Sequence, residues 1–297
     1  MNTAALLAPY EPVLACPERR ALAAALLDEA LAGCTCGRGA AWHARESVYS
    51  AVFEFRCSPA DATFAERLAA ARYVELFFLV DDGPPAEARA LAGRLRAGAV
   101  GLGDSEPARQ ADALLAGLRA RGLPTDRLAD LLADFCAAVA EESDGPPPPE
   151  RSHPLRMDSI GTRPYIECWR LLRGLPVPPP GSVDHRLMDA TVEAVYLAND
   201  LLSAAAEEHV AEQAQGNTVL ARARATGDRA GATEAAVTRY NHLTAALTAA
   251  RERPFPSLLG RVVDGNRASY RDLATTRYPG MPLDLFHRLH LVTRPTD

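Results

Sequence analysis

The chain of 297 residues contains no lysine, since all 32 of its basic residues are arginine. This absence excludes Schiff-base chemistry on lysine, a lysine general base and any phosphate-binding loop whose motif requires lysine. Long apolar runs are also missing: none approaches the roughly 20 residues of a membrane-spanning helix. The first residues lack the basic and apolar regions of a signal peptide. The sequence therefore predicts a cytoplasmic protein with no membrane span.

Aromatic residues make up only 6% of the chain, and the formal net charge is -6. The acidic balance argues against nucleic acid as a partner, because nucleic-acid binding needs a basic face. Six cysteines are scattered along the sequence, with one C-x-C pair at Cys34 and Cys36. No second ligand pair follows at the spacing of a zinc site, so we expect reduced thiols.

Extended alternation of β-branched residues is absent, whereas alanine, leucine, arginine and glutamate dominate the long segments. These residues are strong helix formers, and a hydrophobic content of 48% is enough for a sizeable core. The sequence therefore predicts an all-α fold of roughly ten helices in a single domain over residues 1–297. The expected helices include 19–33, 60–82, 106–121, 125–142, 158–173, 184–214, 217–226, 229–251 and 255–278.

Proline-rich segments separate these helices. Pro84 and Pro85 end the helix over 60–82, because proline cannot continue the helical hydrogen-bond ladder. The segment SDGPPPPERSHP interrupts the chain at 143–154. Both sides continue the same helical composition, so we interpret residues 143–157 as a surface loop within one domain and not as a linker.

Two adjacent acids, Asp81 and Asp82, end the helix over 60–82 directly after an apolar run. Adjacent carboxylates repel each other, and a helix C-terminus is unfavourable for anions, so cations or arginines should compensate them. The pair, followed by Glu87, is therefore a candidate ligand set. A solvated helix terminus would explain the same residues without any ligand.

A second group of oxygen donors lies at Asn199, Ser203 and Glu207. Their i, i+4, i+8 spacing places all three on one helix face over roughly 12 Å. The same face is apolar at the preceding residues Val192 and Val195. Such oxygen donors suit a hard cation such as Mg²⁺. An amphipathic helix whose polar end faces water is the alternative reading.

Two arginines become candidate phosphate-binding residues when they are considered together with these acids. Arg156 follows the proline-rich loop, and Arg277 stands beside Tyr278 at the end of the last long expected helix. Guanidinium groups bind phosphate oxygens in a bidentate manner. A single arginine is usually a surface charge, so this inference depends on its combination with the carboxylates.

In combination, these motifs resemble those of bacterial class I terpene synthases. Asp81-Asp82, preceded by two phenylalanines, is similar to the aspartate-rich motif of that family. Residues 199–207 match its second metal motif, N-D-(L/I/V)-x-(S/T)-x-x-x-E, at every position. Arg156 resembles the pyrophosphate-sensing arginine, and Arg277-Tyr278 resembles the C-terminal Arg-Tyr pair. The resemblance covers roughly residues 60–280.

The chain departs from the family pattern at three positions. Pro85 stands where the aspartate-rich motif has its third aspartate, which leaves Glu87 as the nearest acid. Ala206 replaces a frequent lysine before the last residue of the second motif, and Tyr270 stands near an expected tryptophan. These departures concern single assignments and leave the family resemblance in place.

The resemblance implies a class I terpenoid synthase-like helical bundle around a central apolar pocket. It also implies three Mg²⁺ ions and a linear prenyl diphosphate, farnesyl or geranylgeranyl diphosphate, as substrate. The metal ligands would be Asp81, Glu87, Asn199, Ser203 and Glu207. The catalytic set would be Asp81, Asp82, Arg156, Arg277 and Tyr278. The substrate pocket would include Phe77, Phe78, Ile160, Gly161, Trp169, Val192, Val195, Tyr196 and Tyr270.

In such a site, Mg²⁺ and arginines would neutralise the diphosphate leaving group. Aromatic faces would then stabilise the allylic cation, and the pocket would exclude water while the cation cyclises to a sesquiterpene or diterpene. Bound pyrophosphate is a plausible final proton acceptor. The alternatives are a prenyltransferase of the same fold and a non-catalytic helical homologue or binding protein. The resemblance is also compatible with a homodimer.

Overall fold

The computed structural model of the chain describes residues 2–33, 38–99, 101–145, 147–208, 216–278 and 280–292. Regular secondary structure in these ranges is helical throughout, which confirms the predicted all-α fold. No helix in these ranges is long and apolar enough to cross a membrane. The Cys34–Cys36 pair lies outside the described residues. The other four cysteines, at 16, 57, 136 and 168, are free thiols.

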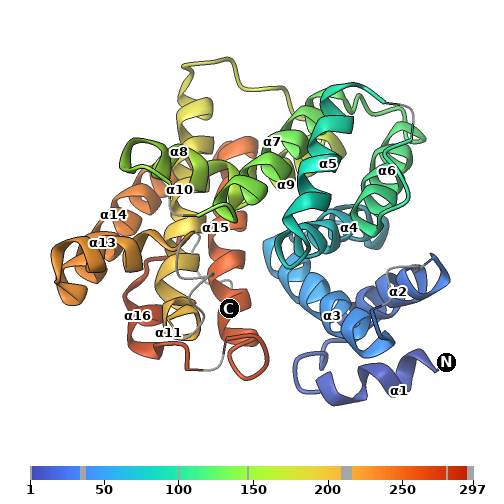
Figure 1. Cartoon of the computed structure of the whole chain (residues 1–297), viewed down its shortest axis with the longest axis horizontal. Helices are drawn as coiled ribbons and strands as arrows, with labels where there is room; N and C mark the ends of the chain where they lie inside the picture. Colours follow the sequence, from blue (N-terminus) through green and yellow to red (C-terminus); the bar gives the residue numbers. More distant parts are fainter. Residues whose placement is uncertain are drawn as a thin grey trace.

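The helices of the first half lie on one side of the molecule and those of the second half mostly on the other (Figure 1). The first half forms α1 (Thr3–Leu7), a 3₁₀ turn (Ala8–Tyr10), α2 (Pro17–Gly33), α3 (Ala40–Cys57), α4 (Phe64–Asp81), α5 (Pro85–Arg96), α6 (Glu106–Arg119) and α7 (Asp126–Glu142). The second half forms α8 (Pro149–Ser159), α9 (Thr162–Leu172), α10 (Val183–Leu202), α11 (Ala204–Glu207), α13 (Thr218–Thr226), α14 (Arg229–Ala250), α15 (Pro254–Asp272) and α16 (Leu283–Arg288).

Some helices differ from the expected ranges. Helices α1, α3, α5 and α16 were not among them, and the loop predicted over 143–157 contains most of α8. This helix begins with proline at its first position, where a fixed φ and a missing N–H are tolerated. The helix expected over 184–214 ends at Leu202, where the Ser203 hydroxyl shares the carbonyl of Asn199 with the Ser203 amide. Its last residues lie outside the described part of the chain.

Helices α10 and α15 pack together in the middle of the bundle (Figure 1). Helix α15 also packs against α3, and Gly265 allows this close approach, since a Cβ there would lie 2.4 Å from the carbonyl oxygen of Arg56. The carboxylate of Asp272, at the end of α15, accepts hydrogen bonds from Arg56 at 2.8 and 3.0 Å and forms an ion pair with Arg19 at 3.1 Å. The fold thus fixes α2, α3 and α15 relative to one another.

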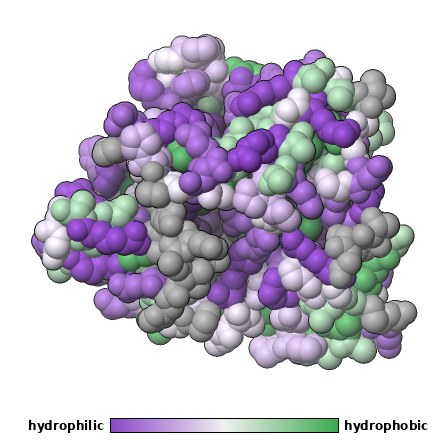
Figure 2. Space-filling model, viewed as in Figure 1, coloured by the Kyte–Doolittle hydropathy of each residue, from purple (hydrophilic) through white to green (hydrophobic). Residues whose placement is uncertain are grey.

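Hydrophilic residues predominate on the face drawn in Figure 2, where the hydrophobic ones are scattered. The large apolar side chains lie inside instead: Leu26, Leu76 and Phe135 are among those that are almost fully buried. Burial of apolar area of this kind is the main source of stability for a helical bundle.

One buried acid of α4 leads to a prediction about stability and pH. Glu75 is 4% exposed and accepts a hydrogen bond from the Ser47 hydroxyl at 2.9 Å. Burial, together with the nearby carboxylates of Glu29, Glu106 and Glu46, raises the pKa of Glu75 to about 8. The folded chain therefore keeps a proton that the unfolded chain loses near its ordinary pKa, and the free energy of unfolding falls as pH rises through this interval.

We therefore expect Glu75→Gln, which cannot ionise, to become progressively more stable than the parent chain between roughly pH 5 and pH 8. Each pH unit in this interval contributes up to about 1.4 kcal/mol to the difference. Melting temperatures of both proteins across the interval measure it. A difference between the two proteins that does not change with pH would contradict the prediction.

Candidate active site

A cavity lies at the centre of the bundle, where α3, α4, α9, α10 and α15 meet. It is lined by aromatic and aliphatic side chains, with a few polar groups among them. The lining residues are Phe53, Tyr73, Val74, Phe77, Phe78, Asp81, Ile160, Gly161, Thr162, Tyr165, Val195, Asn199, Val262, Asn266, Ser269, Tyr270, Leu273, Arg277 and Tyr278. The structure therefore brings residues from both predicted motifs, and from the Arg-Tyr pair, to one enclosed space.

Aromatic rings form much of the apolar wall. The ring of Phe77 stacks on Phe135 with centroids 5.4 Å apart and meets Phe78 edge to face at 5.2 Å. The ring of Phe53 meets Tyr165 edge to face at 5.5 Å. These contacts fix the ring orientations, and ring faces can stabilise a cation that they surround.

Gly161 connects α8 to α9 at the edge of the cavity. Its φ is +66°, in the left-handed region that favours glycine. A Cβ at this position would lie 2.6 Å from the Phe77 ring and 2.7 Å from the Tyr73 hydroxyl. The same hydroxyl donates a hydrogen bond to the Gly161 carbonyl. The junction therefore requires glycine both for its backbone conformation and for the space beside it.

Gly161→Ala is expected to lower the free energy of unfolding by about 2–4 kcal/mol, because backbone strain adds to steric overlap. Gly174→Ala is the matched control: its φ is +59°, but a Cβ there meets nothing within 4 Å. The control should lose only the strain contribution of about 1–2 kcal/mol. Urea unfolding of both variants measures the difference, and equal losses would show that the contacts of Gly161 do not matter.

Asp81 and Asp82 lie at the C-terminal end of α4, as predicted, and Pro84 and Pro85 follow directly. Asp81 borders the cavity. Burial raises the pKa of Asp81, and the adjacent carboxylate of Asp82 raises it further. Because the C-terminal end of a helix adds a further negative potential, this position favours a cation or a phosphate-bound ion.

Arg277 supplies positive charge opposite these acids. Its guanidinium lies 3.4 Å from Asp82 and 3.7 Å from Glu46, and it stacks over the Phe78 ring at 4.4 Å. Glu46 belongs to α3, is 1% exposed, and was not singled out in the sequence. No motif marks it, because a buried and an exposed glutamate look alike in a helix of unknown packing. The contacts hold the Arg277 guanidinium at the cavity wall.

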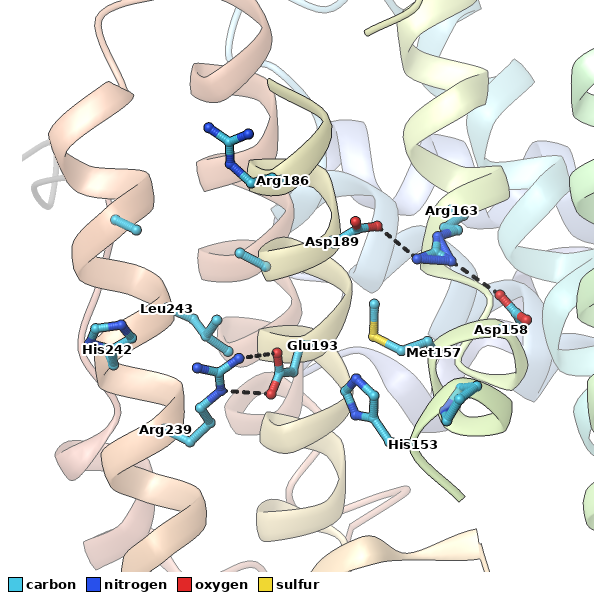
Figure 3. A pocket seen from close by; sticks show the side chains of 13 residues that line it. His153, Met157, Asp158, Arg163, Arg186, Asp189, Glu193, Arg239, His242 and Leu243 are labelled. Carbon is cyan, nitrogen blue, oxygen red and sulfur yellow. Dashed lines mark hydrogen bonds and ion pairs between the residues drawn. The ribbon is translucent and has the colours of Figure 1, made fainter. Parts of the chain in front are cut away.

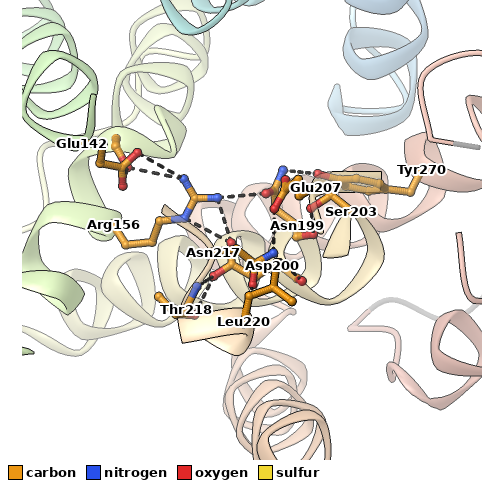
Figure 4. A network of polar contacts seen from close by, with 11 residues as sticks. Glu142, Arg156, Asn199, Asp200, Ser203, Glu207, Asn217, Thr218, Leu220 and Tyr270 are labelled. Atoms are coloured by element: carbon orange, nitrogen blue, oxygen red, sulfur yellow. Dashed lines mark hydrogen bonds and ion pairs between the residues drawn. The ribbon is translucent and has the colours of Figure 1, made fainter. Parts of the chain in front are cut away.

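Arg156 joins the second motif to its surroundings (Figure 4). Its Nη2 donates to Asp200 Oδ1 at 2.8 Å and to Asn199 Oδ1 at 2.9 Å, and its Nη1 lies 3.7 Å from Glu142. Asp200 is fully buried and also accepts from the backbone N–H of Thr218 at 2.8 Å. The sequence identified Asp200 only as a letter of the motif, whereas the structure makes it the centre of this network.

The three predicted oxygen donors gather near the end of α10 (Figure 4). Asn199 also donates to the Tyr270 hydroxyl, and Glu207 accepts from Asn217 at 2.7 Å. An amide, a hydroxyl and one carboxylate form the hard-donor set that Mg²⁺ prefers. No group of three or more His, Cys, Asp or Glu side chains in the described ranges is arranged to hold a metal. The residues thus fit a metal through mixed oxygen donors and not through a carboxylate cluster.

Several predicted residues lie away from the cavity lining. Trp169 is fully buried and stands behind Tyr165, and Val192 is buried within α10. The Tyr196 hydroxyl faces α8, where it contacts His153 at 2.8 Å. Glu87 lies in the first turn of α5, where a helix N-terminus stabilises a carboxylate without a metal. None of the four is among the lining residues, so the structure adds no support to their predicted roles.

A second, open groove runs between α8, α10 and α14 (Figure 3). Its charged side chains largely pair with one another: Arg239 with Glu193 at 2.6 Å, and Arg163 with Asp189 at 2.8 Å. It lacks the enclosed aromatic wall of the central cavity. We therefore place the candidate active site in the central cavity.

The comparisons with known proteins concern the family and the fold. Residues 109–246 match the family model described as terpene synthase family 2, C-terminal metal binding. The fold matches solved class I terpene synthases over most of the chain. These two findings confirm the predicted resemblance to terpene synthases: the family model matches residues 109–246, and the fold is shared with solved terpene synthases.

The solved relatives are distant in sequence. Linalool/nerolidol synthase from Streptomyces clavuligerus has a TM-score of 0.66 at 18% identity, covering 85% of this chain and 96% of that one. Wild-type cucumene synthase has a TM-score of 0.57 at 19% identity, covering 86% and 94%. A variant of the SVS_A2 protein from ancestral sequence reconstruction has a TM-score of 0.68 at 21% identity, covering 89% and 85%. No curated protein sequence matches the chain.

Proposed function

We propose that this protein is a Mg²⁺-dependent class I terpene cyclase. It would ionise a linear prenyl diphosphate, farnesyl or geranylgeranyl diphosphate, and cyclise the cation with release of pyrophosphate. The observation that carries the proposal is the central cavity whose lining combines Asp81, Asn199, Arg277 and Tyr278 with aromatic and aliphatic side chains. A charged, polar part and an apolar part around one space suit a substrate with a charged head and a hydrocarbon tail.

The polar end would hold the diphosphate. Arg277 and Arg156 carry permanent guanidinium charges that match phosphate oxygens, and Tyr278 offers a hydroxyl donor. Asp81 on one side, with Asn199, Ser203 and Glu207 on the other, would hold the Mg²⁺ ions, three by resemblance. When bound, the ions would supply Lewis acidity to the leaving diphosphate.

The apolar end would fold and protect the hydrocarbon chain. Phe77 and Phe78 present rings to the cavity, and Ile160 and Val195 complete its aliphatic surface. Exclusion of water prevents capture of the cation as an alcohol, and the fixed rings limit the conformations of the chain. The outcome of cyclisation would therefore depend on the contour of this wall.

A related structure supports the substrate class. Linalool/nerolidol synthase from Streptomyces clavuligerus in complex with 2-fluorogeranyl diphosphate shares the fold, with a TM-score of 0.61 and 19% identity, covering 88% of this chain and 96% of that one. A prenyl diphosphate is accordingly the first substrate class to test.

Incubation with geranyl, farnesyl or geranylgeranyl diphosphate and MgCl₂, followed by mass spectrometry of the extract, tests the proposal. We expect cyclic hydrocarbon and pyrophosphate from a single substrate, and none when EDTA is present. Formation of a longer prenyl diphosphate only after addition of isopentenyl diphosphate would instead identify a prenyltransferase. Absence of turnover, together with an unchanged melting temperature in Mg²⁺ and pyrophosphate, would indicate a non-catalytic homologue.

A further inference from the structure

A chain of buried polar groups stands behind one wall of the cavity. Tyr165 of α9 lines the cavity, and its hydroxyl donates to Oε2 of Glu54 on α3 at 2.7 Å. The indole N–H of Trp169, one helical turn further along α9, donates to the same hydroxyl oxygen at 3.0 Å. Glu54 and Trp169 have no exposed surface. None of the sequence motifs includes Glu54 or Tyr165.

The protonation state of the Glu54 carboxyl follows from its surroundings. Burial raises the pKa of this carboxyl well above its ordinary value, although the hydrogen bond from Tyr165 and the positive charge of Arg67 oppose the shift. Its other oxygen, Oε1, has no hydrogen-bond partner among the described residues. A buried carboxyl without a cationic partner in contact is most stable as the neutral acid. Glu54 therefore accepts the Tyr165 hydrogen bond as an uncharged group and has little capacity to take up a further proton.

Both polar functions of the Tyr165 hydroxyl are consequently engaged by Glu54 and Trp169, neither of which is among the lining residues. Its proton is directed to Glu54, and a lone pair accepts from Trp169, which can only donate. The ring itself is held by Phe53 at 5.5 Å and by Tyr73 at 6.1 Å between centroids. Tyr165 thus contributes its ring to the cavity while its oxygen is held by two buried neighbours.

We propose that Glu54 and Trp169 are positioning residues that keep the Tyr165 oxygen from reacting with a carbocation in the cavity. This inference rests on the proposed function. If the oxygen were released, its lone pair would remove a proton from the carbon next to the cationic centre. The C–H electron pair would form an alkene, and the phenol would pass a proton to the bound pyrophosphate. The result would be early termination of the reaction.

Trp169→Phe tests this role because it keeps an aromatic ring but removes the N–H donor. We expect the share of acyclic and early-terminated products to rise about fivefold, the effect of losing one buried hydrogen bond. Pyrophosphate release, measured in parallel, reports ionisation separately from product choice. An unchanged product share in the variant would overturn the proposal.

Two further variants separate positioning from structure and from proton transfer. The double variant Trp169→Phe, Tyr165→Phe is expected to restore the parent product share, since it has no hydroxyl left to react. A merely structural role for Trp169 would leave the double variant as altered as the single one. Glu54→Gln keeps an acceptor oxygen, so its share of acyclic and early-terminated products should equal that of the parent protein. Loss of cyclic product in Glu54→Gln would identify Glu54 as a proton acceptor and overturn the proposal.

An assay without substrate keeps this inference apart from the proposed function. Tetranitromethane modifies tyrosine rings whose hydroxyl ionises within its reach, and peptide mass spectrometry locates the product. Trp169→Phe should react at Tyr165 faster than the parent chain, while melting curves verify that both are folded. Equal rates would contradict the inference. Failure of the parent protein to release pyrophosphate from any prenyl diphosphate would contradict the proposed function alone.

Discussion

Glu207→Gln is expected to reduce Mg²⁺-dependent pyrophosphate release by about a hundredfold or more, the scale found when one electrostatic contact to a reacting group is removed. Glu207 is the single carboxylate among the three oxygen donors near the end of α10. Glutamine has nearly the same shape, and its carbonyl can still accept the hydrogen bond that Asn217 donates to Glu207 at 2.7 Å. The substitution therefore removes charge and leaves the local packing in place.

Pyrophosphate release against Mg²⁺ concentration, with farnesyl or geranylgeranyl diphosphate, measures this effect. The increase in melting temperature that Mg²⁺ and pyrophosphate should produce in the parent protein is expected to shrink in parallel. Asp189→Asn is the matched control, because it removes a carboxylate in the outer groove, 2.8 Å from Arg163. Parent-like release by Glu207→Gln would remove Glu207 from the proposed ligand set.

Asp200→Asn is expected to cost about 3–5 kcal/mol of unfolding free energy, because it breaks a buried ion pair from one side. Asp200 has no exposed surface and holds Arg156 at 2.8 Å. It also accepts from the backbone N–H and the hydroxyl of Thr218, at 2.8 and 2.5 Å. An asparagine can satisfy only part of this set and leaves the guanidinium of Arg156 less compensated.

Denaturant unfolding measures the loss, with Asp144→Asn as the control. Asp144 also pairs with an arginine, Arg89 at 2.8 Å, but its side chain is 67% exposed. Exposed pairs contribute about 0–1 kcal/mol, so the control should remain close to the parent. Similar losses in the two variants would show that the Asp200 network adds no special stability.

The sequence predicted the parts of the site that local chemistry defines. The apolar run before Asp81 and the prolines after Asp82 located the end of α4, and the N-D-x-x-S-x-x-x-E spacing located the end of α10. Asp81 belongs to the first pattern and Asn199 to the second, and both border the same cavity. Helix-forming composition was also sufficient for the all-α fold. In each case, neighbours in the sequence determine the result.

The contributions of α3 were not predictable in this way. Glu46 and Glu54 are buried, yet in the sequence they resemble ordinary helix-surface acids. Their roles depend on Arg277 and Tyr165, which lie more than a hundred residues away in the chain. Helix α8 was missed for a different reason: Pro154 lies inside it, against the usual rule for proline. Tertiary packing outweighs local preference at these positions.

The Asn199 side chain has both ends occupied, with its oxygen on Arg156 and its nitrogen on Tyr270. Arg156 uses one of the two lone pairs of this oxygen, so a divalent ion could bind at the other. The two hydrogen bonds would hold the amide in one orientation before any ion arrives. Asn199 would then lose little rotational freedom when an ion binds.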